Sequence, residues 1–247
     1  MKAYRYLLRF SLLSLAVILA FSAASRLLFF FRLEAKHASV IPSLPTIILD
    51  AGHGGEDGGA CGADGTPEKD LNLAITGMLA DYFRMAGYTV VETRTEDRLL
   101  YDEGTPKGHK KQSDLRNRLA VAEQYPDGVL ISIHMNSYPG VECQGLQVWY
   151  SKSRPESALY ATAVQQNVKA LLQPNNNRKI KAAPSGIYLL NRANIPSILI
   201  ECGFLSSPAE CERLANDSYQ RQLAFAIFTS LSQKIEEKAC AETEVMV

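Results

Sequence analysis

Residues 46–55 read Thr-Ile-Ile-Leu-Asp-Ala-Gly-His-Gly-Gly, a short apolar run that passes directly into a glycine-rich loop. Such a run, bounded by glycine, is typical of a strand buried on both faces. Similar runs at 128–134 and 197–201 predict further buried strands, and helical spacing of apolar residues predicts helices at 68–86 and 155–172. This alternation predicts an α/β domain whose largely parallel sheet is covered by helices on both faces.

The remaining segments extend the same pattern. Shorter apolar runs predict three more strands, at 88–93, 145–150 and 186–190. Two more helical regions are predicted, one at 115–123 and one that opens at Ser207 or Pro208 and continues to about Glu237.

Composition limits the classes of function. The chain has 247 residues, 47% of them hydrophobic, and its 26 basic and 26 acidic residues cancel. A nucleic-acid partner is therefore not expected, because no basic field is present. The five cysteines (Cys61, Cys143, Cys202, Cys211 and Cys240) form no C-x-x-C pair, so a thiolate zinc cluster is not expected and they are interpreted as small buried apolar residues.

The N-terminal sequence predicts that the chain is located outside the cytoplasm. Lys2, Arg5 and Arg9 precede an apolar run, Phe10–Phe31, that is interrupted only by Arg26. Its length reaches the roughly 20 residues that span a bilayer, and the basic flank favours an N-in, C-out orientation. The alternative is a signal peptide cleaved near residues 22–24. Either way the rest of the chain is expected to be extracytoplasmic, membrane-anchored or secreted.

These signals divide the chain into four parts. They are a basic flank with an anchor or signal segment at 1–31, a linker at 32–45, a catalytic domain at 46–237 and a C-terminal tail at 238–247.

Four polar side chains are expected at one edge of the sheet. His53 follows the first strand, His134 ends the strand at 128–134, Glu201 ends the strand at 197–201, and Glu68 begins a helix after the glycine loop. Ligands bind at the carboxyl ends of strands in such sheets. Two imidazoles and one carboxylate form a known catalytic zinc set with an open position, and the remaining carboxylate can serve as a general base.

Four ordered motifs carry a family resemblance. They are Asp50-Ala-Gly-His-Gly-Gly55, Glu68-Lys-Asp-Leu-Asn-Leu73, Ser132-Ile-His-Met-Asn-Ser137 and Glu201-Cys-Gly-Phe-Leu-Ser206. Together they resemble the zinc-dependent N-acetylmuramoyl-L-alanine amidases, over residues 46 to 236. The resemblance implies a single domain with a twisted sheet of about six strands. It also implies that His53, Glu68 and His134 bind Zn2+, that Glu201 is the catalytic acid/base, and that the substrate is peptidoglycan.

The sporulation branch of that family is the nearest likeness. It rests on Asn175-Asn-Asn-Arg-Lys179, on the following Gly186-Ile-Tyr-Leu-Leu190 and on the short segment between His134 and Glu201. The likeness implies a role in spore-cortex maturation, through muramic lactam formation, and in germination. An activating protein partner is left open.

Four further residues are candidates for supporting roles. Asp50 is either a hydrogen-bond acceptor for a ligand histidine or a turn residue, and Asn136 either contacts the site or caps a loop. Arg118 is either a structural ion-pair partner or a substrate contact, and Arg178 either binds a stem-peptide carboxylate or lies on the solvated surface. Two rival functions share these motifs: a zinc peptidase acting on stem peptides, and a wall-binding module without activity.

Overall fold

The computed structural model describes residues 22, 24–26, 44–62, 64–138 and 143–245. The chain divides into two compact units, residues 1–42 with 247 and residues 43–246. In the first unit, residues 22 and 24–26 are helical. The predicted anchor Phe10–Phe31 lies otherwise outside the described residues. Within the described part of the chain, no helix combines the length and the apolar character that crossing a membrane requires.

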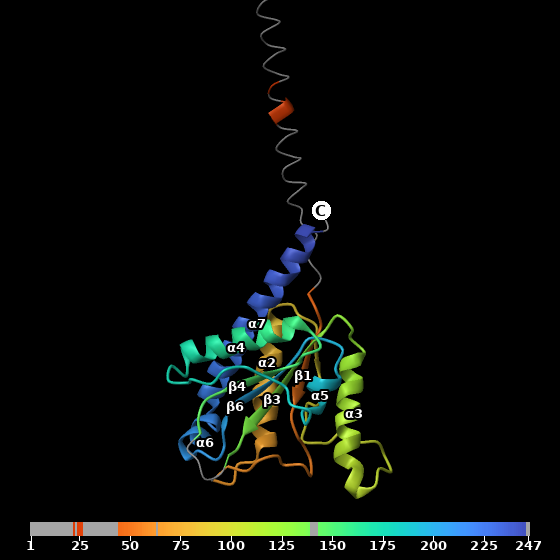
Figure 1. Cartoon of the computed structure of the whole chain (residues 1–247), viewed down its shortest axis with the longest axis vertical. Helices are drawn as coiled ribbons and strands as arrows, with labels where there is room; N and C mark the ends of the chain where they lie inside the picture. Colours follow the sequence, from red (N-terminus) through yellow and green to blue (C-terminus); the bar gives the residue numbers. More distant parts are fainter. Residues whose placement is uncertain (1–21, 23, 27–43, 63, 139–142, 246–247) are drawn as a thin grey trace, which may run out of the picture. The chain divides into compact units, whose positions relative to one another are not determined.

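The second unit is built on a sheet of six strands, in the order β2-β1-β3-β6-β4-β5 (Figure 1). Neighbouring strands pair in parallel except β4 and β6, which are antiparallel. The prediction of a largely parallel sheet of about six strands is confirmed. The strands are β1 (Ile47–Ala51), β2 (Val90–Glu92), β3 (Val129–Asn136), β4 (Gln147–Tyr150), β5 (Lys181–Ala182) and β6 (Ser197–Phe204).

Helices cover both faces of this sheet. On one face α2 and α4 pack against the strands, and α7 packs on both helices; on the other face α3 contacts α5, which contacts β6 (Figure 1). Alternate residues of each central strand supply the two apolar cores, as the strand period requires: Ile131 and Ile133 face the first set of helices and Leu130 faces the second. The helices are α2 (Glu68–Met85), α3 (Lys110–Glu123), α4 (Pro155–Leu171), α5 (Tyr188–Arg192), α6 (Pro208–Leu214) and α7 (Asp217–Val245).

The predicted strand at 186–190 is wrong. The segment is a turn followed by α5, and Leu189 and Leu190 are buried against the second core. A short apolar run has no periodicity that separates a buried strand from a buried helical turn. The strand that does form, β5, has two residues and was not predicted. In addition, α7 extends past the predicted end at Glu237 to Val245.

The cysteines follow their prediction in part. Cys202 and Cys211 are buried as expected, whereas Cys61 and Cys240 are exposed.

Candidate metal centre

Three donor side chains converge at the carboxyl edge of the sheet. His53 follows β1, His134 lies near the end of β3 and Glu68 is the first residue of α2. The Oε1 atom of Glu68 lies 3.0 Å from Nδ1 of His134 and 3.3 Å from Nε2 of His53. One donor atom from each residue falls within 4.8 Å of the others, which is the spacing of a metal-binding triad. The predicted convergence of these residues is therefore present in the structure.

Close backbone approach makes this convergence possible. His53 has a φ of 61°, a conformation that side-chain-bearing residues adopt uncommonly. A Cβ atom at Gly52 would lie 2.2 Å from Cε1 of His134, and one at Gly59 would lie 2.5 Å from Oε2 of Glu68. Both glycines let the loop after β1 pass directly over the donors. The glycine-rich composition of the loop thus has a steric cause at these two positions.

Glu68 is held in place by the backbone around it. Its Oε2 accepts a hydrogen bond from the Ala60 amide at 2.8 Å, and its Oε1 accepts one from the Met135 amide at 3.0 Å. The amide group of Asn72, one helical turn further on, donates to Oε1 at 3.2 Å. Burial raises the pKa of Glu68, but the hydrogen bonds and charges of the two histidines outweigh it and hold that pKa well below its usual range. Glu68 is therefore an anionic donor.

The carboxylate beside His53 is that of Asp57, which sequence reasoning missed. Oδ2 of Asp57 lies 3.0 Å from Nδ1 of His53, on the opposite side of the ring from Glu68. Burial lowers the pKa of His53, yet Glu68 and Asp57 together raise it. A carboxylate in this position fixes the orientation of a ligand histidine and increases its basicity. The signal in the sequence was the aspartate four residues after the histidine in the glycine loop.

Asp50 serves a different purpose from the predicted one of accepting from a ligand histidine. It is 1% exposed, and its oxygens accept hydrogen bonds from Thr93, Ser132 and Arg118 at 2.8, 2.6 and 2.7 Å. Burial raises the pKa of Asp50, but the Arg118 guanidinium and the Ser132 hydroxyl lower it to about 2. Among these partners, Arg118 links Asp50 to the loop that carries His53.

Arg118 forms ion pairs, as one of the two predictions described, and it is buried. Besides Asp50, it pairs with Asp114 at 2.8 Å. Its Nη2 donates to the carbonyl of His53 at 2.7 Å and its Nη1 to that of Ala51 at 2.7 Å. The guanidinium thus holds the backbone at His53 in its uncommon conformation. Arg118 is therefore a positioning residue.

Glu201 faces the donors from the neighbouring strand. It is in register with His134 in the parallel pair of β3 and β6, so both side chains project from the same face of the sheet. Its Oε2 is buried and has no hydrogen-bond partner among the described residues. The pKa of Glu201 is raised to about 7: burial is the largest cause and Glu68 adds to it, whereas His134, His53 and Arg178 oppose the shift. A carboxyl group with this pKa can both accept and donate a proton near neutral pH.

The two remaining candidates are Asn136 and Arg178. The backbone carbonyl of Asn136 accepts from the Leu205 amide at 2.8 Å, which joins the ends of β3 and β6. Arg178 lies near Glu201, with its guanidinium 4.4 Å above the ring of Phe204.

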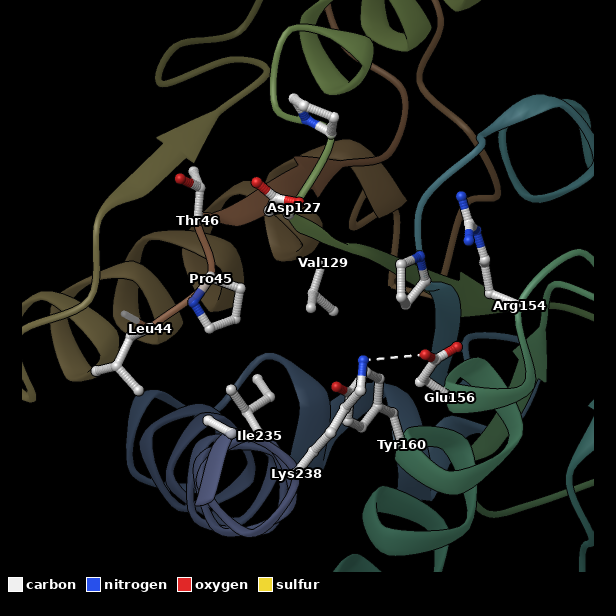
Figure 2. A pocket seen from close by; sticks show the side chains of 14 residues that line it. Leu44, Pro45, Thr46, Asp127, Val129, Arg154, Glu156, Tyr160, Ile235 and Lys238 are labelled. Atoms are coloured by element: carbon white, nitrogen blue, oxygen red, sulfur yellow. Dashed lines mark hydrogen bonds and ion pairs between the residues drawn. The ribbon is translucent and has the colours of Figure 1, made fainter. Parts of the chain in front are cut away.

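A cavity of about 610 Å3 lies at the opposite edge of the sheet. Figure 2 shows its lining residues, with Thr46 and Val129 at the starts of β1 and β3 and an ion pair between Lys238 and Glu156. Strands β1 and β3 run away from this cavity toward the metal-binding triad. Polar chemistry at the carboxyl edge, rather than cavity size, therefore indicates the functional site.

Comparison with known proteins agrees with this geometry. Residues 47–233 match the family described as N-acetylmuramoyl-L-alanine amidase. This chain belongs to that family. The match covers the whole sheet and each of the four site residues, so the amidase activity that the sequence motifs implied is supported by the full domain.

Named members of the amidase family are similar over most of their length. The germination-specific N-acetylmuramoyl-L-alanine amidase of Bacillus subtilis is 37% identical over 194 residues, which span 78% of this chain and 80% of that protein. The structure of the CwlD amidase from Clostridioides difficile, in complex with the GerS lipoprotein, is 39% identical with a TM-score of 0.73, over 77% of this chain and 98% of that one. The amidase AmiC2 of Nostoc punctiforme is 30% identical with a TM-score of 0.66, over 76% and 96%.

Proposed function

We propose that this amidase is zinc-dependent and acts outside the cytoplasmic membrane on peptidoglycan. It hydrolyses the amide between N-acetylmuramic acid and the first L-alanine of the stem peptide, in spore-cortex maturation and in germination. The observation that carries the proposal is the triad of His53, Glu68 and His134 with Glu201 in register beside it. The similarity to a germination-specific amidase supports the spore role, and that to a lipoprotein-bound relative supports an extracytoplasmic protein partner.

The donor set fits Zn2+. Two imidazole nitrogens and one carboxylate oxygen form the ligand set of several zinc hydrolases, which leave one position for water or substrate. His53 and His134 direct a ring nitrogen at the same oxygen of Glu68, and Asp57 lies behind His53. When bound in such a site, Zn2+ supplies a Lewis acid for the amide carbonyl and lowers the pKa of water toward neutrality.

Glu201 would move the proton in this reaction. Its buried Oε2, which no described residue engages, is the atom that would accept the proton of the attacking water. The resulting carboxylic acid would then donate that proton to the nitrogen of the leaving L-alanine. Arg118 and Asp57 would contribute by holding His53 in position.

Metal removal tests the function directly. We expect the purified full-length chain to release free stem peptide from muropeptides, to lose this activity on chelation and to recover it with Zn2+ but not with Mg2+, which prefers oxygen ligands. Release would be measured by chromatography and mass spectrometry. Cleavage within the stem peptide would instead indicate a peptidase, and binding to peptidoglycan without any cleavage would indicate a wall-binding module.

A single methyl group at Gly52 should weaken the zinc site. In Gly52→Ala the new Cβ would meet the ring of His134, whereas in Gly58→Ala, on the same loop, it would meet nothing within 4 Å. We expect the zinc affinity of Gly52→Ala to fall about 10- to 100-fold, the range seen when ligand orientation is disturbed. Competition titration against a chelating dye measures this. Equal zinc affinities in the two variants would contradict the steric role of Gly52.

A further inference from the structure

Arg178 is held rigidly beside the site. It lies in the segment between α4 and β5, and its Nε donates to the carbonyl of Gln144 at 3.1 Å. Its Nη1 donates to Oε1 of Gln147 at 2.8 Å, and its guanidinium stacks on Phe204. Three residues from two segments, the start of β4 with its preceding loop and the end of β6, thus fix one side chain. The entropy that a ligand contact normally costs through ordering of the side chain is therefore already lost on folding.

Gln147 connects Arg178 to Glu201. The Gln147 side chain is 2% exposed, and Gln147 pairs with Glu201 in the antiparallel register of β4 and β6. Its Nε2 donates to the carbonyl of Lys179 at 2.6 Å, so both ends of the amide are engaged. A buried glutamine therefore places a guanidinium on the face of the sheet from which Glu201 projects.

The contacts of Arg178 position its charge without neutralising it. They involve an amide oxygen, a backbone carbonyl and an aromatic ring. Within the described part of the chain, no carboxylate pairs with Arg178, and its Nη2 donates no hydrogen bond. The other arginines near the site differ: Arg118 is paired with two aspartates, and Arg94 donates to four backbone carbonyls from a buried position. Arg178 retains donors in the planar arrangement that matches a carboxylate.

In the proposed substrate, the negative charge lies on the stem peptide and not on the sugar. In the proposed reaction the lactyl carboxyl group of the sugar is consumed in the scissile amide, so the remaining carboxylates belong to the stem peptide. We infer that Arg178 is a specificity residue that binds a stem-peptide carboxylate next to Glu201. This inference rests on the proposed function and adds the chemical feature by which the site would select its substrate.

Two muropeptides and two variants test the inference. The probes are a muropeptide with free peptide carboxylates and the same muropeptide with each carboxylate converted to a carboxamide. We expect Arg178→Gln to lower kcat/KM about 10- to 100-fold on the carboxylate form, chiefly through KM, because a charge-assisted hydrogen bond is lost. On the carboxamide form, variant and wild type should agree. Lys179→Gln removes the neighbouring exposed charge and should behave as wild type on both.

The outcomes separate the alternatives. An equal loss by Arg178→Gln on both probes, with zinc content unchanged, would assign Arg178 to positioning Glu201 and would overturn the inference. No loss on either probe would overturn it as well. If wild-type protein released peptide from neither probe, the proposed function itself would fail. This result is distinguishable from the other two because it concerns the wild-type protein alone.

Discussion

We expect Glu201→Gln to reduce amide cleavage by about 100- to 10,000-fold while the protein stays folded and retains stoichiometric zinc. The substitution keeps the shape of the side chain and removes the basic oxygen that no described residue engages. Glu201 is in register with His134 but is not part of the triad of donors. Peptide release, zinc content by atomic spectroscopy and the thermal midpoint, all measured on one preparation, would check this expectation.

The pH dependence of the stability of the metal-free protein gives an independent test of the raised pKa of Glu201. Burial raises its pKa to about 7 from an ordinary value of 4.5, so the fold favours the protonated form. A carboxyl group with a raised folded pKa loses stabilisation as pH rises between these two values. Glu201→Gln cannot ionise, and it should therefore raise the thermal midpoint of the chelated protein more at pH 8 than at pH 5.

Two other roles for Glu201 predict different results. A purely structural role predicts a lower thermal midpoint with the activity of the folded fraction intact. A role as metal ligand predicts that zinc and activity are lost together. Near-normal peptide release by Glu201→Gln would remove this residue from the mechanism.

His134→Ala should abolish stoichiometric zinc binding and, with it, activity. The substitution removes one of the three donor side chains, and affinity should fall by more than the roughly 100-fold that disturbing a supporting residue costs. The fold should survive because the imidazole belongs to neither apolar core. Circular dichroism and zinc analysis measure the two effects separately.

The exposed His109 supplies a matched control for His134. His109→Ala removes an imidazole from a short turn of helix before α3 and should bind zinc as wild type does. If His134→Ala retained one equivalent of zinc, the assignment of the triad would be wrong. If both histidine variants lost zinc, the loss could not be ascribed to the triad.

Five of the six strands and the positions of the four site residues were predictable because they follow from short-range patterns. Buried strands read as apolar runs, and in parallel sheets their carboxyl ends share one edge, so the positions of His53, His134 and Glu201 followed from topology alone. Asp57 was not predictable, because its approach to His53 depends on how the glycine loop turns back on itself. The same holds for Gln147, whose contact with Arg178 joins segments 31 residues apart.

Strand direction and very short elements also escaped prediction. An apolar run shows that a segment is extended but not whether it runs with or against its neighbour, so the reversal of β4 was not visible. The two-residue β5 is too short to show a pattern, and Leu189 with Leu190 is equally compatible with a strand and with a helical turn.

The reversal of β4 brings two sets of side chains to the site from opposite directions. Because β4 and β5 run opposite to β6, their amino-terminal approaches, including Gln147 and Arg178, reach the edge at which β1 and β3 end. The three donor side chains thus come from the carboxyl ends of β1 and β3 and from the start of α2. The charge beside Glu201 comes from the segments that lead into β4 and β5. The side chain that would recognise the substrate and those that would bind zinc therefore reach one site from oppositely directed strands of the same sheet.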